Sequence, residues 1–337
     1  MKRIYNDINL AERNSFGVVQ RAQTLVEFET AEDLRDYFSK SQPSKWYVLG
    51  GGNNTLFTED YDGVLLTPVS RDVTVLRETE HSVSLRVEAG ADWDTLVEWC
   101  VNRDLWGMEN LSLIPSSVGA APVQNIGAYG AEAKDGISVV EYFDTKTLNV
   151  VRLSNAQCQF AYRESIFKHE LKGRAIILAV EFELSKMAKP NLGYGDVISE
   201  VEARGGATLR NIRDAVCAIR SRKLPDTKVL GNAGSFFKNP IVERTVAERL
   251  MAEYPDMPNY SVPSDPTKIK LAAGWLIDKA GMKGYREGAV GVHDRQALVL
   301  VNHGGATGGE VLRLADKVCS VVKERFGVEI SPEVNIL

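Results

Sequence analysis

The sequence contains little cysteine, and its cysteines lie far apart. Four occur in 337 residues, at positions 100, 158, 217 and 319, and none forms a C-x-x-C pair. Neither a zinc site nor a disulfide framework is therefore indicated. The four histidines lack the H-x-x-x-H spacing of a metal site. We expect Cys100, Cys217 and Cys319 to be small core residues of helices, because each stands beside apolar residues in a helical pattern.

The chain also lacks an excess of basic residues and any long apolar run. Its net charge is −5, which argues against a general nucleic-acid binder. No apolar run is long enough to span a bilayer, and residues 1–7 lack the apolar core of a signal peptide. The sequence therefore predicts a cytoplasmic protein that binds neither nucleic acid nor a membrane.

The composition that remains is that of a globular protein, with 44% hydrophobic and 25% charged residues. A length of 337 residues suits two or three domains. Short alternating strands and amphipathic helices follow one another, which predicts an α+β fold. We expect helices at 30–40, 92–101, 208–223, 265–280 and 311–322, strands at 46–49, 64–66, 83–89, 139–143, 175–184 and 297–301, and a last strand within 332–337.

A glycine-rich turn, Gly50-Gly51-Gly52-Asn53-Asn54-Thr55, directly follows the strand expected at 46–49. The backbone N–H groups of such a turn can point at an anion such as a pyrophosphate. The turn matches neither the dinucleotide fingerprint G-x-G-x-x-G nor a P-loop. A plain glycine turn is the alternative interpretation.

Residues 112–130 are rich in small residues and contain two prolines, so they cannot form a regular helix. A segment of this length without regular structure is usually disordered or wraps a ligand. Four branched apolar residues argue against disorder. Backbone donors and small side chains suit a large flat cofactor whose edge needs hydrogen bonds.

Ser235 lies in the third notable segment, Gly231-Asn-Ala-Gly-Ser-Phe-Phe-Lys-Asn-Pro240. Two glycines and an alanine allow close approach to a ligand while the segment presents a single hydroxyl group. A tight, half-buried loop with core phenylalanines is the alternative. A serine hydrolase is disfavoured, because Ala233 and Phe237 occupy the glycine positions of the G-x-S-x-G elbow. The glycine run at 304–309 could hold phosphate, but a strand-to-helix connector capped by Thr307 is favoured.

Taken in order along the chain, these segments resemble motifs of the UDP-N-acetylenolpyruvoylglucosamine reductase (MurB) family. The resemblance covers nearly the whole chain, and motifs in the right order are specific where any one alone would not be. The matching stretches are 50–55, 114–130, the arginine motif Ala161-Tyr-Arg-Glu-Ser165, the serine motif 231–240 and the glutamate motif Ser331-Pro-Glu-Val334. Residues 192–196 resemble the tyrosine loop of the type I enzymes, which closes over the nucleotide.

The resemblance implies an FAD-binding fold of the vanillyl-alcohol-oxidase (PCMH) type in two subdomains, followed by a C-terminal α/β substrate domain. The expected boundaries are residues 1–69 with 330–337 for the first subdomain, 70–224 for the second and 225–329 for the substrate domain. We expect a monomer.

The implied activity is that of a UDP-N-acetylmuramate dehydrogenase in peptidoglycan precursor synthesis. NADPH would reduce non-covalently bound FAD, and hydride would pass to C3 of UDP-N-acetylglucosamine enolpyruvate. Arg163, Ser235 and Glu333 would be catalytic. Tyr194 of the tyrosine loop would contact the substrate, and we expect Lys223, Asn239 and Gln296 to contact its diphosphate and sugar. FAD would be held by Gly50, Gly51, Gly52, Asn53, Asn54, Thr55, Ile114, Pro115, Ser116, Ser117, Gly119, Gln124, Asn125, Gly127, Ala128 and Tyr129.

Elementary chemistry is consistent with these implied catalytic roles. Hydride addition at C3 drives negative charge toward the substrate carboxylate, and a cation such as Arg163 stabilises that charge most in the transition state. The enolate-like species then needs a proton at C2, which Ser235 can donate if it is held in place. A protonated Glu333 would donate a hydrogen bond to the developing oxyanion.

Taken without the resemblance, the same residues have ordinary interpretations. Arg163 would be a surface ion-pair partner of Glu164 or another acidic residue, Glu333 a solvated carboxylate near the chain end and Tyr194 a loop-packing residue. A different FAD-linked oxidase or dehydrogenase of the same fold is the main functional alternative. Covalent flavin attachment is disfavoured, because residues 112–130 contain neither histidine nor cysteine.

Overall fold

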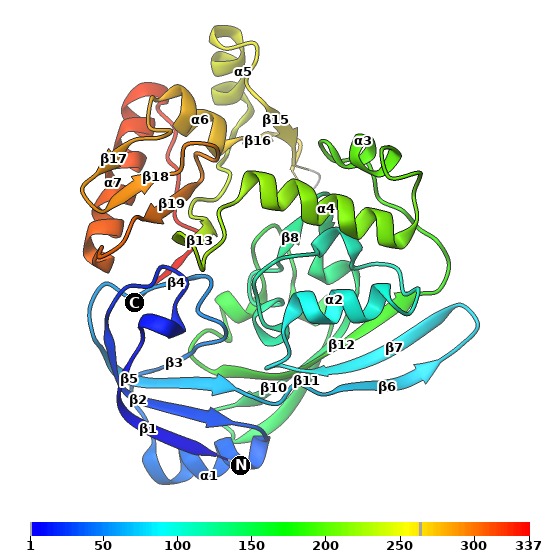
Figure 1. Ribbon diagram of the computed structural model, residues 1–337. Coiled ribbons are helices and arrows are strands. Elements are labelled where there is room, and N and C mark those ends of the chain that lie inside the picture. Colours follow the sequence, from blue (N-terminus) through cyan, green and yellow to red (C-terminus); the bar gives the residue numbers. More distant parts are fainter. Residues whose placement is uncertain (1, 263–264) are drawn as a thin grey trace. The chain divides into compact units, whose positions relative to one another are not determined.

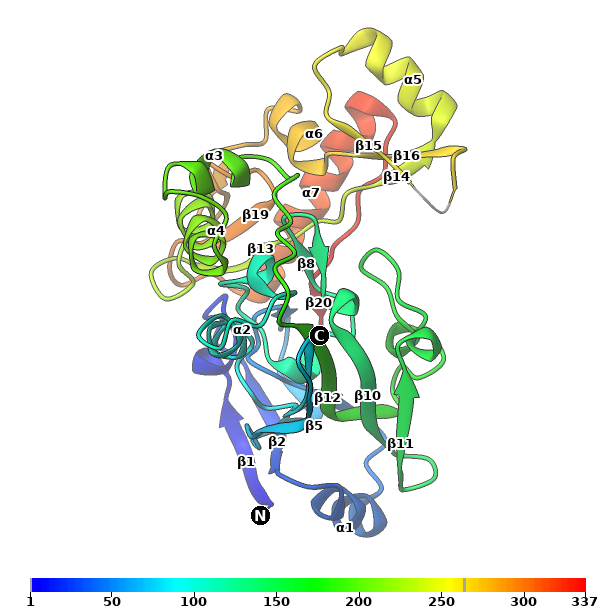
Figure 2. The same cartoon turned by 90° about the vertical axis from the view of Figure 1, so that its right-hand side faces the viewer.

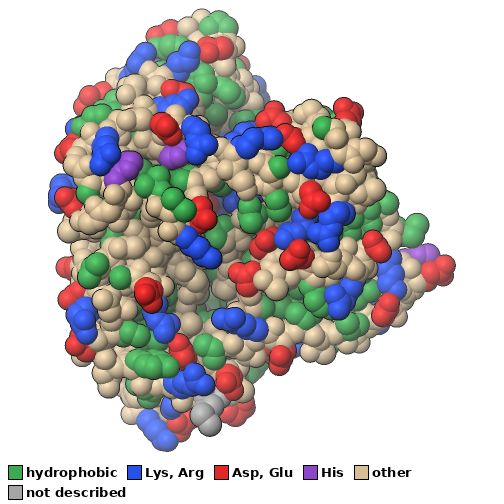
Figure 3. Space-filling view, in the orientation of Figure 1, with side chains coloured by type: hydrophobic (Ala, Val, Ile, Leu, Met, Phe, Trp, Pro, Cys, Tyr) green, Lys and Arg blue, Asp and Glu red, His purple; other side chains and the backbone are tan. Residues whose placement is uncertain are grey.

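The computed structural model describes residues 2–262 and 265–337. The chain divides into two compact units. Unit 1 comprises residues 1–8, 22–51 and 62–222, and unit 2 comprises residues 9–21, 52–61 and 223–337. On the face drawn in Figure 3, acidic and basic side chains are interspersed. Within the described residues, no helix is long and apolar enough to cross a membrane.

The first sheet of unit 1 is built from the N-terminal strands (Figure 1). The predicted strands at 46–49 and 64–66 pair in parallel, with Trp46 opposite Val64. The predicted helix becomes α1 (Ala31–Ser41), and Thr30 forms a capping box with Asp33. The strand order is β1 (Arg3–Asn9), β2 (Arg21–Phe28), β5 (Tyr61–Pro68) and β3 (Trp46–Val48).

The second sheet of unit 1 is antiparallel throughout, and its strands curve across the lower half of Figure 2. Its central strand β12 (Ala175–Ser185) is buried at nearly every position, which explains its near-continuous apolar sequence. The order is β11 (Asn149–Ser154), β10 (Ile137–Asp144), β12, β7 (Ser82–Glu88) and β6 (Val73–Glu78).

Two buried clusters hold unit 1 together. One joins α1 and the first sheet to one face of the second sheet through side chains such as Phe38, Leu66 and Phe143. The other covers the opposite face with helices α2 (Trp93–Val101) and α4 (Leu209–Lys223). Both helices were predicted, and the predicted cap Asp92 accepts a hydrogen bond from the Thr95 N–H group. α3 (Val197–Glu202) precedes α4.

The small-residue segment between α2 and β10 contains only short elements, as its composition predicts. Two single turns of 3₁₀ helix, η2 (Glu109–Leu111) and η3 (Val118–Ala120), precede a short β-hairpin, and a third, η4 (Ala133–Asp135), follows it. The hairpin strands are β8 (Gly127–Ala128) and β9 (Ala131–Glu132). Such an irregular segment brings many backbone polar groups to one region.

Unit 2 contains two small sheets with helices. The larger has the order β13 (Gly231–Ser235), β19 (Val299–Asn302), β18 (Val290–Val292) and β17 (Arg286–Glu287), and is accompanied by α6 (Ala273–Lys279) and α7 (Gly308–Phe326). The smaller has the order β14 (Ile241–Glu243), β16 (Lys268–Leu271) and β15 (Asn259–Ser261), next to α5 (Arg244–Glu253).

The ends of the last helix match the prediction. Thr307 caps α7 in a capping box with Glu310, and Gly327 ends the helix at φ +68°. The C-terminal residues add a strand, β20 (Asn335–Ile336), which runs parallel to β4 (Thr55–Leu56). The glycine run at 304–309 is therefore a capped connector.

The helix predicted over 265–280 is wrong in its first half. Residues 268–271 form strand β16, in which Ile269 and Leu271 are buried between partly exposed lysines. Asp265 does not cap a helix; its side chain accepts a hydrogen bond from the Thr267 N–H group, 3.0 Å away, in a turn. The period-two burial and pairing with strands on both sides outweighed the local Asp-Pro start signal.

Candidate active site

The glycine turn and the small-residue segment meet in unit 1. A Cβ atom on Gly50 would lie 2.7 Å from the Ser117 Oγ atom, so only glycine fits this contact without movement. Among the described residues, the backbone N–H groups of Gly50, Gly51, Ser116 and Ser117 donate to no protein acceptor. Two adjoining loops thus carry N–H donors that are available to an anionic ligand.

The small-residue segment is held against the end of strand β7. The Val118 and Gly119 N–H groups donate to the Ala91 and Ala89 carbonyl groups, both over 2.9 Å. A Cβ atom on Gly119 would lie 2.6 Å from the Ala89 Cβ atom. The role of this glycine is therefore close backbone packing, which fixes the donor groups of the preceding serines.

Asn125 is fully buried, and its side chain bonds to the protein at both ends. Its Nδ2 atom donates to Glu132 Oε2 (2.9 Å) and to the Ala161 carbonyl (3.1 Å), and its Oδ1 atom accepts from the Lys134 N–H group (3.0 Å). These bonds tie the small-residue segment to the turn that carries Arg163. Its side chain thus supports the loop.

Arg163 lies in a tight turn at φ +57°, a conformation that non-glycine residues rarely adopt. The turn is closed by paired hydrogen bonds between Ala161 and Glu164. The Arg163 Nη2 atom donates to the Gly127 carbonyl over 2.9 Å. The guanidinium group is therefore anchored to strand β8 of the hairpin, and the strained backbone marks this turn as a candidate functional feature.

The tyrosine loop, which with the preceding Asn191 spans residues 191–196, lies against the turn of the same hairpin. The rings of Tyr129 and Tyr194 meet edge to face, with centroids 6.1 Å apart. Tyr194 remains 46% exposed. Burial raises the pKa of the Tyr129 hydroxyl group, and nearby Arg220 opposes this shift. Each ring therefore still has a surface that a ligand could contact.

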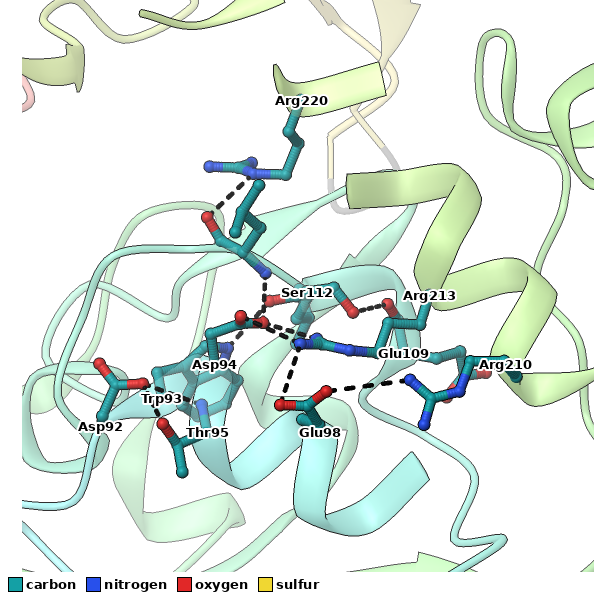
Figure 4. Close-up of polar contacts among 12 residues, drawn as sticks. Asp92, Trp93, Asp94, Thr95, Glu98, Glu109, Ser112, Arg210, Arg213 and Arg220 are labelled. Atoms are coloured by element: carbon teal, nitrogen blue, oxygen red, sulfur yellow. Dashed lines mark hydrogen bonds and ion pairs between the residues drawn. The ribbon is translucent and has the colours of Figure 1, made fainter. Parts of the chain in front are cut away.

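Arg220 was missed by the sequence reasoning, although it stands three residues before the predicted substrate residue Lys223 in a helical pattern. Figure 4 shows Arg220 reaching from α4 to the Leu113 carbonyl, which accepts from its Nε atom over 3.2 Å. Burial lowers the pKa of Arg220, with Tyr129 opposing and Arg163 adding to the shift. Two guanidinium groups thus interact electrostatically in this region, and an anion would relieve their repulsion.

The loop that receives Arg220 is fixed from below by Asp94 (Figure 4). Asp94 Oδ1 accepts from the Leu113 N–H group over 2.5 Å and from Arg213 over 2.6 Å. Burial alone would raise the pKa of Asp94, but these hydrogen bonds keep it below its usual value. The carboxylate therefore links α2, α4 and the loop.

In unit 2 the structure brings Ser235 and the Glu333 segment together. Residues 236–238 run antiparallel to 331–333: the Glu333 N–H group donates to the Phe236 carbonyl (2.7 Å), and the Lys238 N–H group donates to the Ser331 carbonyl (2.9 Å). Phe236 and Phe237 are buried, as the alternative core interpretation predicts. Ser235 is only half-buried, and its hydroxyl group bonds to no other described residue.

The second part of the glycine turn joins this arrangement. The Asn54 side chain donates to the Glu333 carbonyl over 3.3 Å, and the Asn54 carbonyl accepts from the Asn335 N–H group over 3.0 Å. The parallel pairing of Thr55 with Asn335 continues the contact. Residues separated by some 280 positions are therefore held side by side by backbone pairing.

Two predicted substrate residues lie at the start of α6. The Asn239 Oδ1 atom accepts from the Ala273 N–H group over 3.0 Å. A Cβ atom on Gly274 would lie 3.5 Å from the Gln296 Oε1 atom. His293 is buried nearby in sequence, and its Nδ1 atom accepts from the Gln296 N–H group over 3.3 Å. Asn239 and Gln296 thus both lie next to the N-terminal end of α6. Lys223, the third predicted substrate residue of this set, follows Arg222 as the next residue of unit 2.

Comparison with known proteins decides the family. Relatives named UDP-N-acetylenolpyruvoylglucosamine reductase from Chromobacterium violaceum and Pseudomonas aeruginosa are 47% and 45% identical to this chain, covering 98% and 97% of both chains in each pair. The chain belongs to the UDP-N-acetylenolpyruvoylglucosamine reductase family. The family's C-terminal domain model matches residues 225–337, and an FAD-binding domain model matches residues 22–153.

The fold agrees with this membership of the reductase family. The crystal structure of the MurB reductase from Thermus caldophilus superposes with a TM-score of 0.70 at 23% identity, covering 100% of this chain and 99% of that one. The predicted α+β FAD-binding fold and the predicted family are therefore confirmed. The hydrolase alternative is not supported, since Ser235 ends strand β13 and is not in a strand-to-helix elbow.

Proposed function

We propose that this reductase-family protein converts UDP-N-acetylglucosamine enolpyruvate to UDP-N-acetylmuramate, with NADPH as the hydride donor and FAD as the cofactor. The observation that carries the proposal is the pairing of the Ser235 and Glu333 segments beside the Asn54 turn. It unites the serine motif, the glutamate motif and part of the glycine turn in one structural unit. The names of the relatives supply the substrate.

The residues present suit FAD. When bound, FAD would accept hydride from NADPH and pass it to the substrate. The N–H groups of Gly50, Gly51, Ser116 and Ser117 would donate to its pyrophosphate, because they donate to no described protein acceptor. The remaining predicted FAD positions would flank these contacts. Of these, Asn125 and Gly119 would act by holding the loop in place, since both are already bonded to the protein.

Ser235 would donate the proton to C2 of the substrate. Its hydroxyl group bonds to no described side chain, so no protein interaction has to break before transfer. The strand pairing of residues 236–238 fixes its backbone. Phe236 and Phe237, which follow Ser235 directly, are buried, so the hydroxyl group stands next to apolar packing.

Arg163 would stabilise the negative charge that develops toward the substrate carboxylate. Its anchor at Gly127 leaves the guanidinium group pre-oriented, so little reorganisation is needed during the reaction. As the sequence predicts, Glu333 in its protonated form would donate a hydrogen bond to the developing oxyanion. Arg220, which interacts with Arg163, is a further candidate for binding an anionic group of the substrate.

Tyr194 would cover the nucleotide part of the substrate, and Lys223, Asn239 and Gln296 would contact its diphosphate and sugar. The half-exposed Tyr194 ring can cover a ligand, and a lysine provides a mobile positive charge for a diphosphate. The division into an FAD-binding part (1–69 with 330–337, and 70–224) and a substrate domain (225–329) stays a prediction, as do the monomeric state and the cytoplasmic location.

The test is to follow NADPH oxidation by the purified protein with and without the enolpyruvyl substrate. We expect a yellow protein that releases free FAD on denaturation, and oxidation that depends on the substrate. A colourless protein that cannot bind FAD would exclude every flavin-based function. A yellow protein whose NADPH oxidation ignores this substrate would favour another FAD-linked oxidase or dehydrogenase of the same fold.

A further inference from the structure

We infer that Asn110 is a positioning residue, whose side-chain amide holds the tyrosine loop against the hairpin turn at Tyr129 and Gly130. The inference rests on the proposed function in one respect: Tyr194 of this loop is taken to contact the substrate. Every residue concerned lies in unit 1.

The Asn110 amide bridges two segments that are distant in sequence. Its Nδ2 atom donates to the Tyr129 carbonyl and to the Asn191 carbonyl, both over 2.8 Å. The residue is 2% exposed and lies in the single turn η2. One amide group therefore uses both of its N–H bonds to join the hairpin turn to the start of the tyrosine loop.

The choice of asparagine has a cost that only these two bonds explain. Its Oδ1 atom is buried and accepts no hydrogen bond from any described residue. A buried polar atom without a partner is unfavourable, and an apolar side chain would avoid it. The two donated bonds are thus the reason for a polar residue at this position. The pairing of both N–H bonds with carbonyl oxygens also fixes which end of the amide is which.

The hairpin turn that receives Asn110 is itself strained. Tyr129 and Gly130 form the two-residue loop between β8 and β9, with φ angles of +49° and +80°. Positive φ at both positions is the pattern of a type I′ turn, in which asparagine is favoured at the first position and a bulky side chain is disfavoured. A tyrosine persists there only if its surroundings hold it, and the bond from Asn110 to its carbonyl does so.

The tyrosine loop completes the contact from its own side. The Asn191 Nδ2 atom donates to the Gly130 carbonyl over 3.0 Å. A Cβ atom on Gly130 would lie 3.3 Å from that nitrogen and 3.6 Å from the Tyr194 Cβ atom. Together with the edge-to-face contact of Tyr129 and Tyr194, these interactions define one position of the Tyr194 ring.

The hairpin connects this contact to Arg163. Gly127, two residues before the turn, accepts the hydrogen bond from the Arg163 Nη2 atom. The same short hairpin therefore carries the docked tyrosine loop at its turn and the guanidinium anchor on its first strand. Loss of the Asn110 amide should release the loop first and affect Arg163 less, because the Arg163 bond does not involve the turn.

The test compares Asn110→Ala with the matched variant Asn155→Ala in the complete FAD-bound protein. Asn155 also donates from Nδ2 to two backbone carbonyl groups of unit 1, those of Lys134 and Ile137, both over 2.8 Å. Each variant thus loses two hydrogen bonds from a side-chain amide to backbone carbonyl groups. Only in Asn110→Ala does one of the lost bonds involve the tyrosine loop. A milder second variant, Asn191→Ala, removes the exposed side chain that bonds to Gly130.

Two readouts separate positioning from general stability. Hydrogen exchange of residues 188–196 without substrate should accelerate in Asn110→Ala and Asn191→Ala but not in Asn155→Ala. In steady state, KM for the UDP-linked substrate should rise roughly tenfold in Asn110→Ala, the size expected for losing buried hydrogen bonds. The kcat value should change less, and the rate of flavin reduction by NADPH should stay as in the wild type.

Unchanged exchange in the loop, or an equal KM rise in Asn155→Ala, would overturn the inference. If Asn110→Ala does not fold, Asn191→Ala decides, because its side chain is exposed: normal loop exchange and normal KM in that variant would also overturn it. Failure of the proposed function is distinguishable. In that case the wild type would not turn over the enolpyruvyl substrate, whereas the exchange comparison would still report on the docking of the loop.

Discussion

Arg163 in unit 1 and Ser235 in unit 2 are held in opposite ways. The Arg163 side chain is itself anchored, through a hydrogen bond to Gly127, on a backbone at positive φ. At Ser235 the protein holds the backbone, through a strand and the adjoining pairing with residues 331–333, and leaves the hydroxyl group without a described protein partner.

The difference corresponds to the two chemical tasks that we propose. A group that stabilises charge is most effective when it is already oriented, because reorganisation during the reaction costs energy. A proton donor must instead be positioned but free to transfer its proton. Variants of the two residues should therefore differ in how far they change stability as well as activity.

The largest expected effect is that of Ser235→Ala. Turnover of the enolpyruvyl substrate should fall by roughly 10²–10⁴-fold, the usual contribution of a positioned general acid. Flavin reduction by NADPH and the unfolding temperature should stay close to those of the wild type, since the hydroxyl group has no described protein partner to lose. Single-turnover kinetics of the two half-reactions and a thermal melt measure these quantities.

Ser261→Ala in the short strand β15 of the same unit is a suitable control and should leave both half-reactions unchanged. Steady-state turnover that survives in Ser235→Ala would show that another group donates the proton.

Arg163→Ala should have the next largest effect and should change both quantities. We expect turnover to fall by roughly 10²–10³-fold, as when an oriented donor to a developing oxyanion is removed. Loss of the bond to Gly127 should also lower the free energy of unfolding by about 1 kcal/mol. Kinetics with the enolpyruvyl substrate and denaturant unfolding test this pair of changes.

Arg152→Ala is the matched control, because Arg152 is another arginine of unit 1 that bonds through side chains, to Glu141 and Glu181. It should retain turnover. A stability loss without a turnover loss in Arg163→Ala would make Arg163 a purely structural residue and remove the contrast with Ser235.

The smallest expected effect is a difference between the units in acid. Asp144 of unit 1 is almost fully buried, and hydrogen bonds from Arg174 lower its pKa from 3.8 to about 2. This carboxylate therefore stabilises the fold above about pH 4, and the contribution is lost as the pH falls toward about 2. Allowing for the partly exposed arginine, we expect about 1–2 kcal/mol.

Unit 2 should lose less in the same range. Its Glu287 and Glu329 also have lowered pKa values, through Lys317 and Lys323, but their side chains are 62% and 75% exposed. Exposed pairs of this kind contribute little. Hydrogen-exchange protection, expressed relative to the intrinsic rate at each pH, should fall between pH 7 and pH 3. In the wild type the fall should be larger in unit 1 than in unit 2. Asp144→Asn should reduce that change, and Glu329→Gln should not.

Much of the fold could be predicted from local signals because those signals act locally. The capping box at Thr30, the cap at Asp92 and the Thr307 cap all begin helices where the sequence indicates them. The period-two pattern of 83–89 gives strand β7. The helix predicted from Asp265 is wrong over 268–271, because pairing with strands on both sides is a tertiary effect.

The candidate site was predictable where a motif carries it and not elsewhere. Ser235 and Glu333 were identified from motifs, yet nothing local indicated that residues 236–238 pair with 331–333. Asn110 and Arg220 were missed, because an isolated asparagine and an arginine in an amphipathic helix have no distinctive spacing. Their roles depend on carbonyl groups of Tyr129, Asn191 and Leu113, which only folding brings near.

The sequence by itself determined the family, the α+β class and the starts of most helices, because motifs, caps and hydrophobic period are properties of neighbouring residues. Only the tertiary structure decided that Gly50 lies closely against the Ser117 side chain, that Arg163 is anchored on a strained hairpin, and that the Ser235 hydroxyl group is left without a described protein partner. These features depend on contacts between residues far apart along the chain, and such contacts exist only once the backbone has folded.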